Sequence, residues 1–223
     1  MFNIILFIIL FLLLIVPHEL GHLFFAKFFK VGVPSFGVGM GKRLISFKIG
    51  ETIYGLHLLP IGGFCEIDGL DNEKQGKKSF LTKQKYKKIS IILAGVFMNI
   101  VVFGLCFLYL RSQHYFPHKE MGIIVAYVTE AKYILGIVGL VFVFIQLKMT
   151  FNLFIFFLGF LSLNIGLVNL LPIPPLDGFW SFYFLKKRKT SVRKLVKYGT
   201  WFLILTTVIV LIADIAFIFR CLK

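Results

Sequence analysis

Apolar residues dominate four long stretches of the chain, and polar segments separate them. A helix needs about 20 apolar residues to cross a bilayer, and each stretch is close to or above that length. The stretches lie at about 3–29, 89–110, 151–171 and 200–219. A fifth apolar stretch, 133–147, has only 15 residues, which favours an interfacial or re-entrant segment over a full span. The pattern predicts an all-α membrane protein with about four transmembrane helices.

The segment between the first two spans has strand character instead. Residues 33–66 are rich in glycine, β-branched and aromatic residues, and Gly50-Glu51 is a turn signal within them. We expect a small membrane-associated β-hairpin or sheet here, followed by a turn that contains Gly62 and Gly63. A free strand edge could bind an extended peptide by β-addition, although a plain connecting hairpin explains the same residues equally well.

Composition and charge support a single polytopic membrane domain over residues 1–223. Hydrophobic residues make up 58% of the chain, and the mean hydropathy is +0.89. The formal net charge of +15 comes largely from segments between apolar spans, in 31–88 and 186–197. This placement indicates membrane orientation and disfavours nucleic-acid binding. With four spans, both basic segments are expected on the cytosolic side and both termini outside.

The first apolar stretch contains the sequence His18-Glu19-Leu20-Gly21-His22. On a helix, residues i and i+4 lie on one face, so both imidazoles can bind one zinc ion. Glu19 is the next residue along, where a carboxylate can accept a proton from the attacking water as a general base. Two histidines and a glutamate inside an apolar span are costly unless they have a task, which disfavours chance occurrence.

A third metal ligand is expected near the end of the third span, in residues 169–178. Pro172, Pro174 and Pro175 exclude a regular helix there and leave backbone groups that must face protein or water. Asp177 follows them and is the best candidate ligand, although an Asp-Gly turn at the membrane surface is the alternative. Two histidines and one aspartate leave a fourth position for water, as a catalytic zinc site requires.

Other polar residues have simpler interpretations. His57 is expected to be structural, and Asn99 lies one turn after Gly95, from where it could brace a neighbouring loop. Asp68 is expected in a solvated acidic face with neighbouring acids of 66–73.

The two motifs together resemble those of the site-2 protease family of intramembrane zinc metalloproteases, in its bacterial branch. His-Glu-Leu-Gly-His matches the family's zinc motif, and residues 169–178 match its second motif, NxxPxPxLDG. The resemblance implies that His18, His22 and Asp177 bind zinc and that Glu19 is the general base and acid. It also implies a set of substrate contacts, which are Asn169, Pro172, Pro174, Gly62, Gly63 and Asn99.

This resemblance implies hydrolysis of peptide bonds within or next to transmembrane segments of other membrane proteins. One Zn²⁺ would act near the cytosolic side of a bacterial inner membrane, either in regulated intramembrane proteolysis or in signal-peptide clearance. The segment 111–133 is too short for the PDZ domain that many relatives carry. A non-catalytic zinc-binding membrane scaffold is the alternative function, and the presence of Glu19 counts against it. Neither the substrate nor the oligomeric state follows from the sequence.

Overall fold

A computed structural model describes the chain except for residues 1, 71–75, 119–148, 187–191 and 222–223. The short apolar segment expected at 133–147 therefore lies outside the described residues. The helices are α1 (Phe2–Phe28), α2 (Lys85–Ser112), α5 (Phe151–Asn169), α6 (Asp177–Lys186) and α7 (Val192–Cys221), with a 3-10 turn η1 (Phe80–Thr82).

Four of the described helices are long and apolar enough to cross a membrane, which confirms the four predicted spans. These are α1, α2, α5 and α7. α1 continues through Pro17 without a break in its assigned helix. The start of α5 is capped, because the hydroxyl of Thr150 accepts a hydrogen bond from the backbone N–H of Leu153 at 3.2 Å. Pro172 and Pro174 then prevent α5 from continuing beyond Asn169.

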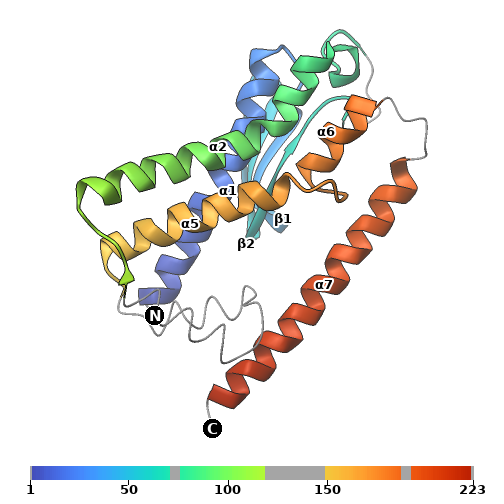
Figure 1. Cartoon of the computed structure of the whole chain (residues 1–223). Helices are drawn as coiled ribbons and strands as arrows, with labels where there is room; N and C mark the ends of the chain where they lie inside the picture. Colours follow the sequence, from blue (N-terminus) through green and yellow to red (C-terminus); the bar gives the residue numbers. More distant parts are fainter. Residues whose placement is uncertain (1, 71–75, 119–148, 187–191, 222–223) are drawn as a thin grey trace.

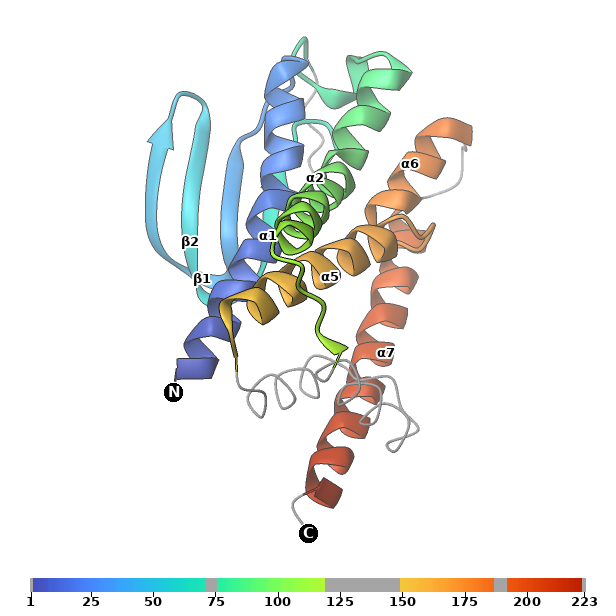
Figure 2. The same cartoon turned by 60° about the vertical axis from the view of Figure 1, so that its left-hand side comes forward.

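The strands β1 (Ser35–Ile49) and β2 (Thr52–Glu66) form the predicted sheet after the first helix. The residues Ser35 to Val38 pair with two parts of β2, Ile53 to Leu56 on one side and Gly63 to Glu66 on the other. Figure 2 shows the outer part of the hairpin projecting away from the helices beside α1. Leu44 and Phe47 on this part are more than half exposed, as suits an element in contact with a membrane.

Two apolar clusters hold the helices together. One joins α1, α2 and α5 around Leu14 and Phe157, and the other joins α1, α2 and the base of the sheet around Ala26, Phe36 and Phe80. Along α1 the two clusters lie on either side of the HExxH motif. The motif is therefore fixed between two packed regions of the protein.

α6 was not among the predicted elements. Asp177 is the first residue of this ten-residue helix, which begins immediately after the proline-rich segment and packs against α2. Phe184 of α6 contacts Phe80, with ring centroids 5.1 Å apart. The expected loop carrying Asp177 is thus a short loop followed by an anchored helix.

α7 stands apart from the other helices in Figure 1. None of its apolar span Leu195–Ile212 is buried. At Gly199 the helix lies against the proline-rich loop, because a Cβ atom there would meet the carbonyl oxygen of Pro174. The start of α1 and the end of α7 lie toward the same end of the molecule in Figure 1.

Candidate metal centre

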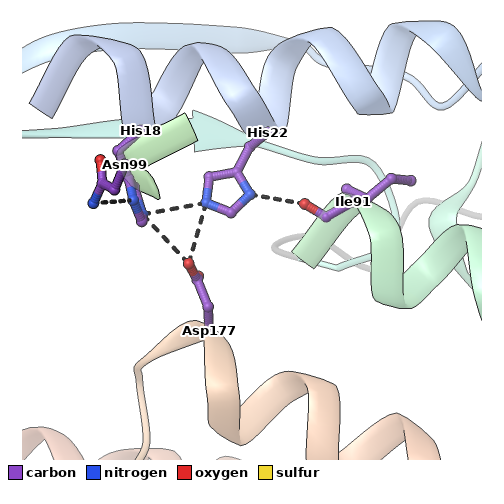
Figure 3. A network of polar contacts seen from close by, with 5 residues as sticks. All are labelled: His18, His22, Ile91, Asn99 and Asp177. Atoms are coloured by element: carbon purple, nitrogen blue, oxygen red, sulfur yellow. Dashed lines mark hydrogen bonds and ion pairs between the residues drawn. The ribbon is translucent and has the colours of Figure 1, made fainter. Parts of the chain in front are cut away.

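His18 and His22 lie one turn apart on α1, and both side chains are buried. Their ring centroids are 5.0 Å apart, and their Nε2 atoms are separated by 3.4 Å. Both Nε2 atoms therefore face one point, as the i, i+4 spacing predicts (Figure 3).

Two glycines allow this face of α1 to lie close to α2. A Cβ atom on Gly21 would lie 2.4 Å from the carbonyl oxygen of Ala94. A Cβ atom on Gly95 would lie 2.5 Å from Nε2 of His22 and 2.6 Å from Nε2 of His18. The absence of a side chain at 21 lets the two helices approach each other, and its absence at 95 provides the space in which the imidazoles sit.

Asp177 approaches the two imidazoles from the N-terminus of α6 (Figure 3). Its Oδ2 lies 3.3 Å from Nε2 of His18 and 3.4 Å from Nε2 of His22. Burial raises the pKa of Asp177, but hydrogen bonding and attraction from the two histidines outweigh burial and lower it to about 2. Asp177 is therefore a carboxylate at neutral pH, which is the form that binds a metal.

The three ligand atoms fit one metal ion. They lie within 4.8 Å of one another, and the distances between them are 3.3 to 3.4 Å. Two ligand atoms of a tetrahedral zinc ion with bonds of about 2.0–2.1 Å lie about 3.3–3.4 Å apart. The spacing of the protein atoms matches that geometry without movement of any helix.

Glu19 and the metal-binding atoms share one cavity of about 730 Å³. Glu19 lies next to the sheet, because a Cβ atom on Gly63 would lie 2.9 Å from Cγ of Glu19. The cavity wall opposite α1 is formed by Asn169 and Leu176, and Trp180 extends it along α6. A carboxylate beside these ligand atoms, in a cavity lined mostly by apolar residues, is suited to proton transfer.

The second ring nitrogen of each histidine faces a group on α2. Nδ1 of His22 lies 2.9 Å from the carbonyl oxygen of Ile91, to which it donates a hydrogen bond. Nδ1 of His18 lies 3.3 Å from Nδ2 of Asn99. Figure 3 shows both contacts on the side of the rings away from Asp177.

The structure brings some of the expected substrate contacts to the cavity and not others. Gly62, Gly63 and Asn169 line it. Asn99 is fully buried behind His18 and does not line the cavity. The remaining two, Pro172 and Pro174, belong to the loop before α6 and are also not among the lining residues.

Sequence reasoning missed three contributors to the site. The carbonyl of Ile91 has no sequence signal, because every residue has one. Phe64 and Trp180 line the cavity, but aromatic residues are so frequent in this chain, with 28 Phe alone, that their identity did not distinguish them.

The site combines an HExxH helix in an apolar span with a distant aspartate, an arrangement that defines a membrane-embedded metallopeptidase class. Comparison with known proteins agrees with this class. The model of Peptidase family M50 matches residues 6–211. The chain belongs to this family, the site-2 protease family.

Several bacterial relatives bear the provisional name of a zinc metalloprotease. One from Clostridium perfringens is 37% identical over 112 residues, which cover 50% of this chain and 33% of the relative. One from Clostridium acetobutylicum is 38% identical over 106 residues, covering 48% of this chain and 31% of the relative. One from Staphylococcus aureus is 46% identical over 71 residues, covering 31% and 17%. The chain thus matches at most about a third of the length of these relatives.

Proposed function

We propose that this protein is an intramembrane zinc metalloprotease that hydrolyses peptide bonds within or next to transmembrane segments of other membrane proteins. The observation that carries the proposal is the convergence of His18, His22 and Asp177 on one point beside Glu19. This point lies in a cavity bounded by helices long and apolar enough to span a membrane. The names of the bacterial relatives agree with zinc as the metal.

The chain's own residues divide the chemistry between them. A zinc ion held by the three ligands would polarise the scissile carbonyl and lower the pKa of the attacking water. Glu19 takes a proton from that water and returns it to the leaving amine, as a general base and then a general acid. Asn169 lines the same cavity, and its amide is a candidate donor to the developing oxyanion, a type of contact worth about 3 kcal/mol.

The sheet offers a place for the substrate backbone. The residues Gly63 to Glu66 pair with Ser35 to Val38 on one side, and Gly62 to Cys65 line the cavity. No other strand among the described residues pairs with the opposite side of this edge. An unwound substrate segment can therefore add to the edge as a further strand, with its scissile bond close to Glu19.

The proposed membrane orientation places the site toward the cytosol. The C-terminal end of α1, the start of α2 and the loop before α6 then lie on the side that carries the lysine-rich segments. We propose the cytoplasmic membrane of a bacterium as the location, with both termini outside. Water would reach Glu19 from the cytosolic side.

The test compares the wild-type protein with Glu19→Gln and Asp177→Asn in detergent. Zinc content and cleavage of a panel of single-span substrates are measured on the same samples. We expect Glu19→Gln to keep zinc and to reduce cleavage by about 10²–10⁴-fold, because it loses general acid–base catalysis. Asp177→Asn should lose zinc. The matched control is Glu51→Gln, at an exposed acid far from the cavity, which should behave as wild type.

Zinc in the wild type without Glu19-dependent cleavage of any substrate would favour the non-catalytic scaffold. A wild type that binds no metal would contradict both functions.

A further inference from the structure

We propose that Asn99 is a positioning residue whose side-chain oxygen accepts a hydrogen bond from Nδ1–H of His18 and so fixes Nε2 as the metal-binding nitrogen. This role differs from the substrate contact expected from the sequence. It rests on the proposed binding of zinc by His18.

The position of Asn99 excludes direct contact with a substrate in this structure. The residue is 0% exposed and is not part of the cavity wall. Its amide instead meets the ring of His18 on the side away from the metal point (Figure 3). Among the described residues of the site, His18 is the one whose side chain Asn99 contacts by a polar group.

The protonation of His18 decides how the amide must be turned. Nε2 of His18 faces Nε2 of His22 and Oδ2 of Asp177, so Nε2 is the nitrogen available to a metal. A metal-binding imidazole is neutral and carries its proton on the other nitrogen, Nδ1. The nearest amide atom is Nδ2, at 3.3 Å, which is also a donor. Two donors cannot form a hydrogen bond.

A half-turn of the amide removes this conflict. Oδ1 of Asn99 is buried and has no hydrogen-bond partner among the described residues. The oxygen and nitrogen of an amide are nearly identical in shape, so their exchange costs no space. In the first orientation Oδ1 has no described partner, and in the second Nδ2 has none. The two orientations therefore differ in whether Nδ1–H of His18 meets a donor or an acceptor. With Oδ1 toward His18, Nδ1–H has an acceptor.

The two histidines are then held in the same way. Nδ1–H of His22 donates to the backbone carbonyl of Ile91. With the amide turned, Nδ1–H of His18 donates to Oδ1 of Asn99, from the position that Nδ2 occupies at 3.3 Å. Both acceptors belong to α2. A metal-binding histidine generally needs such a partner, because the partner fixes both the tautomer and the ring orientation.

α5 holds Asn99 in place from the other side. The hydroxyl of Ser162 donates to the backbone carbonyl of Asn99 at 3.1 Å. A Cβ atom on Gly166 would lie 3.3 Å from Cβ of Asn99, so the two helices are in close contact there. The amide is therefore supported by packing as well as by its own helix.

The test measures zinc affinity in the full-length protein in detergent, by competition with a chelator. Asn99→Asp keeps an acceptor of the same shape, whereas Asn99→Leu has a similar shape but no acceptor. We expect Asn99→Leu to bind zinc about 10–100-fold more weakly, as for lost partners of metal ligands in general, and Asn99→Asp to bind as tightly as wild type. Cobalt-loaded Asn99→Leu should also show an altered visible absorption spectrum.

Gly104→Ala is the matched control on the same helix, because nothing lies within 4 Å of a Cβ atom there, and it should leave zinc affinity unchanged. Asn99→Ala adds no bulk and serves as a second acceptor-free variant if Asn99→Leu does not fold.

Equal zinc affinity in wild type, Asn99→Leu and Asn99→Ala, with zinc lost in His18→Ala, would overturn this inference alone. Equal weakening in Asn99→Asp and Asn99→Leu would also overturn it, because packing would then be the cause. Unchanged zinc affinity in His18→Ala would overturn the proposed metal site together with the inference.

Discussion

A methyl group at position 95 would occupy the space in which the imidazoles of His18 and His22 meet. The Cβ atom of an alanine there would lie 2.5 Å from Nε2 of His22 and 2.6 Å from Nε2 of His18, well inside van der Waals contact. α2 and α1 are fixed by apolar clusters above and below the motif, so neither helix can move aside easily. The imidazoles would have to turn away from the metal point.

We therefore predict that Gly95→Ala loses zinc while the protein stays folded. Overpacking of a close contact typically costs about 1–3 kcal/mol, which lowers the unfolding temperature without abolishing the fold. Zinc content and thermal unfolding of the purified protein check this. Gly104→Ala is the matched control on the same helix, because nothing lies within 4 Å of a Cβ atom there. Full zinc occupancy in Gly95→Ala would contradict the prediction.

At this scale the sequence predicted which side chains meet and missed the residues that support them. His18, His22 and Asp177 converge as expected, because their types and spacing carry the signal. The support of His18 by Asn99 depends on how α2 is rotated against α1, which no local pattern determines. The solvated acidic face was wrong for Asp68, which is buried. Its backbone is held by hydrogen bonds to Gly32 and Phe80, far from it in sequence.

Among the elements, α6 has the most direct influence on the site, because it carries Asp177 at its first residue. Its far end is held by Phe184, whose ring lies 5.1 Å from that of Phe80 and 5.6 Å from the ammonium of Lys88. A cation over an aromatic ring adds to this contact. The position of the carboxylate therefore depends on aromatic packing almost two turns away.

Phe184→Ala should weaken metal binding without altering any ligand. Loss of this partly buried ring is expected to destabilise the fold by about 1–3 kcal/mol and to loosen α6 against α2. The zinc dissociation constant should rise, and the protein should still bind zinc stoichiometrically at high concentration. Phe182→Ala is the control, because Phe182 is on the same helix and 51% exposed. Equal zinc affinity in the two variants would argue against an anchoring role for Phe184.

The sequence predicted the long elements better than the short ones. Four apolar runs and a glycine-rich strand region have strong periodic or length signals. α6 has only ten residues and follows three prolines, so its local pattern indicated a loop. Its helical form depends on packing of its aromatic side chains against α2 and η1, which is a tertiary effect.

On the scale of the whole molecule, the proposed membrane orientation determines which end of α2 faces the cytosol. α2 begins near the lysine-rich segment, and its C-terminal end would reach the opposite surface of the membrane. Gln84 and Gln113 flank this helix and are both exposed. They form a matched pair of positions for testing the proposed orientation.

We predict that Gln84→Cys, in a background without the natural cysteines, reacts with a membrane-impermeant thiol reagent only from the cytosolic side. Gln113→Cys should react only from outside, because basic segments favour the cytosol. Labelling in intact bacterial cells and in inverted membrane vesicles distinguishes the two sides. Labelling of Gln84→Cys from outside would reverse the proposed orientation and place the candidate metal centre toward the other face of the membrane.

The metal site also joins parts of the chain that are far apart in sequence. His22 belongs to the first helix, and Asp177 follows most of the remaining chain. A link that closes so long a loop removes conformational entropy from the unfolded chain, so an ion that binds only the folded form stabilises that form. Zinc at about 100 times its dissociation constant would add about 2.7 kcal/mol. Newly made protein that has not yet acquired metal would therefore be less stable than the metal-loaded form and a preferred target for cellular quality control.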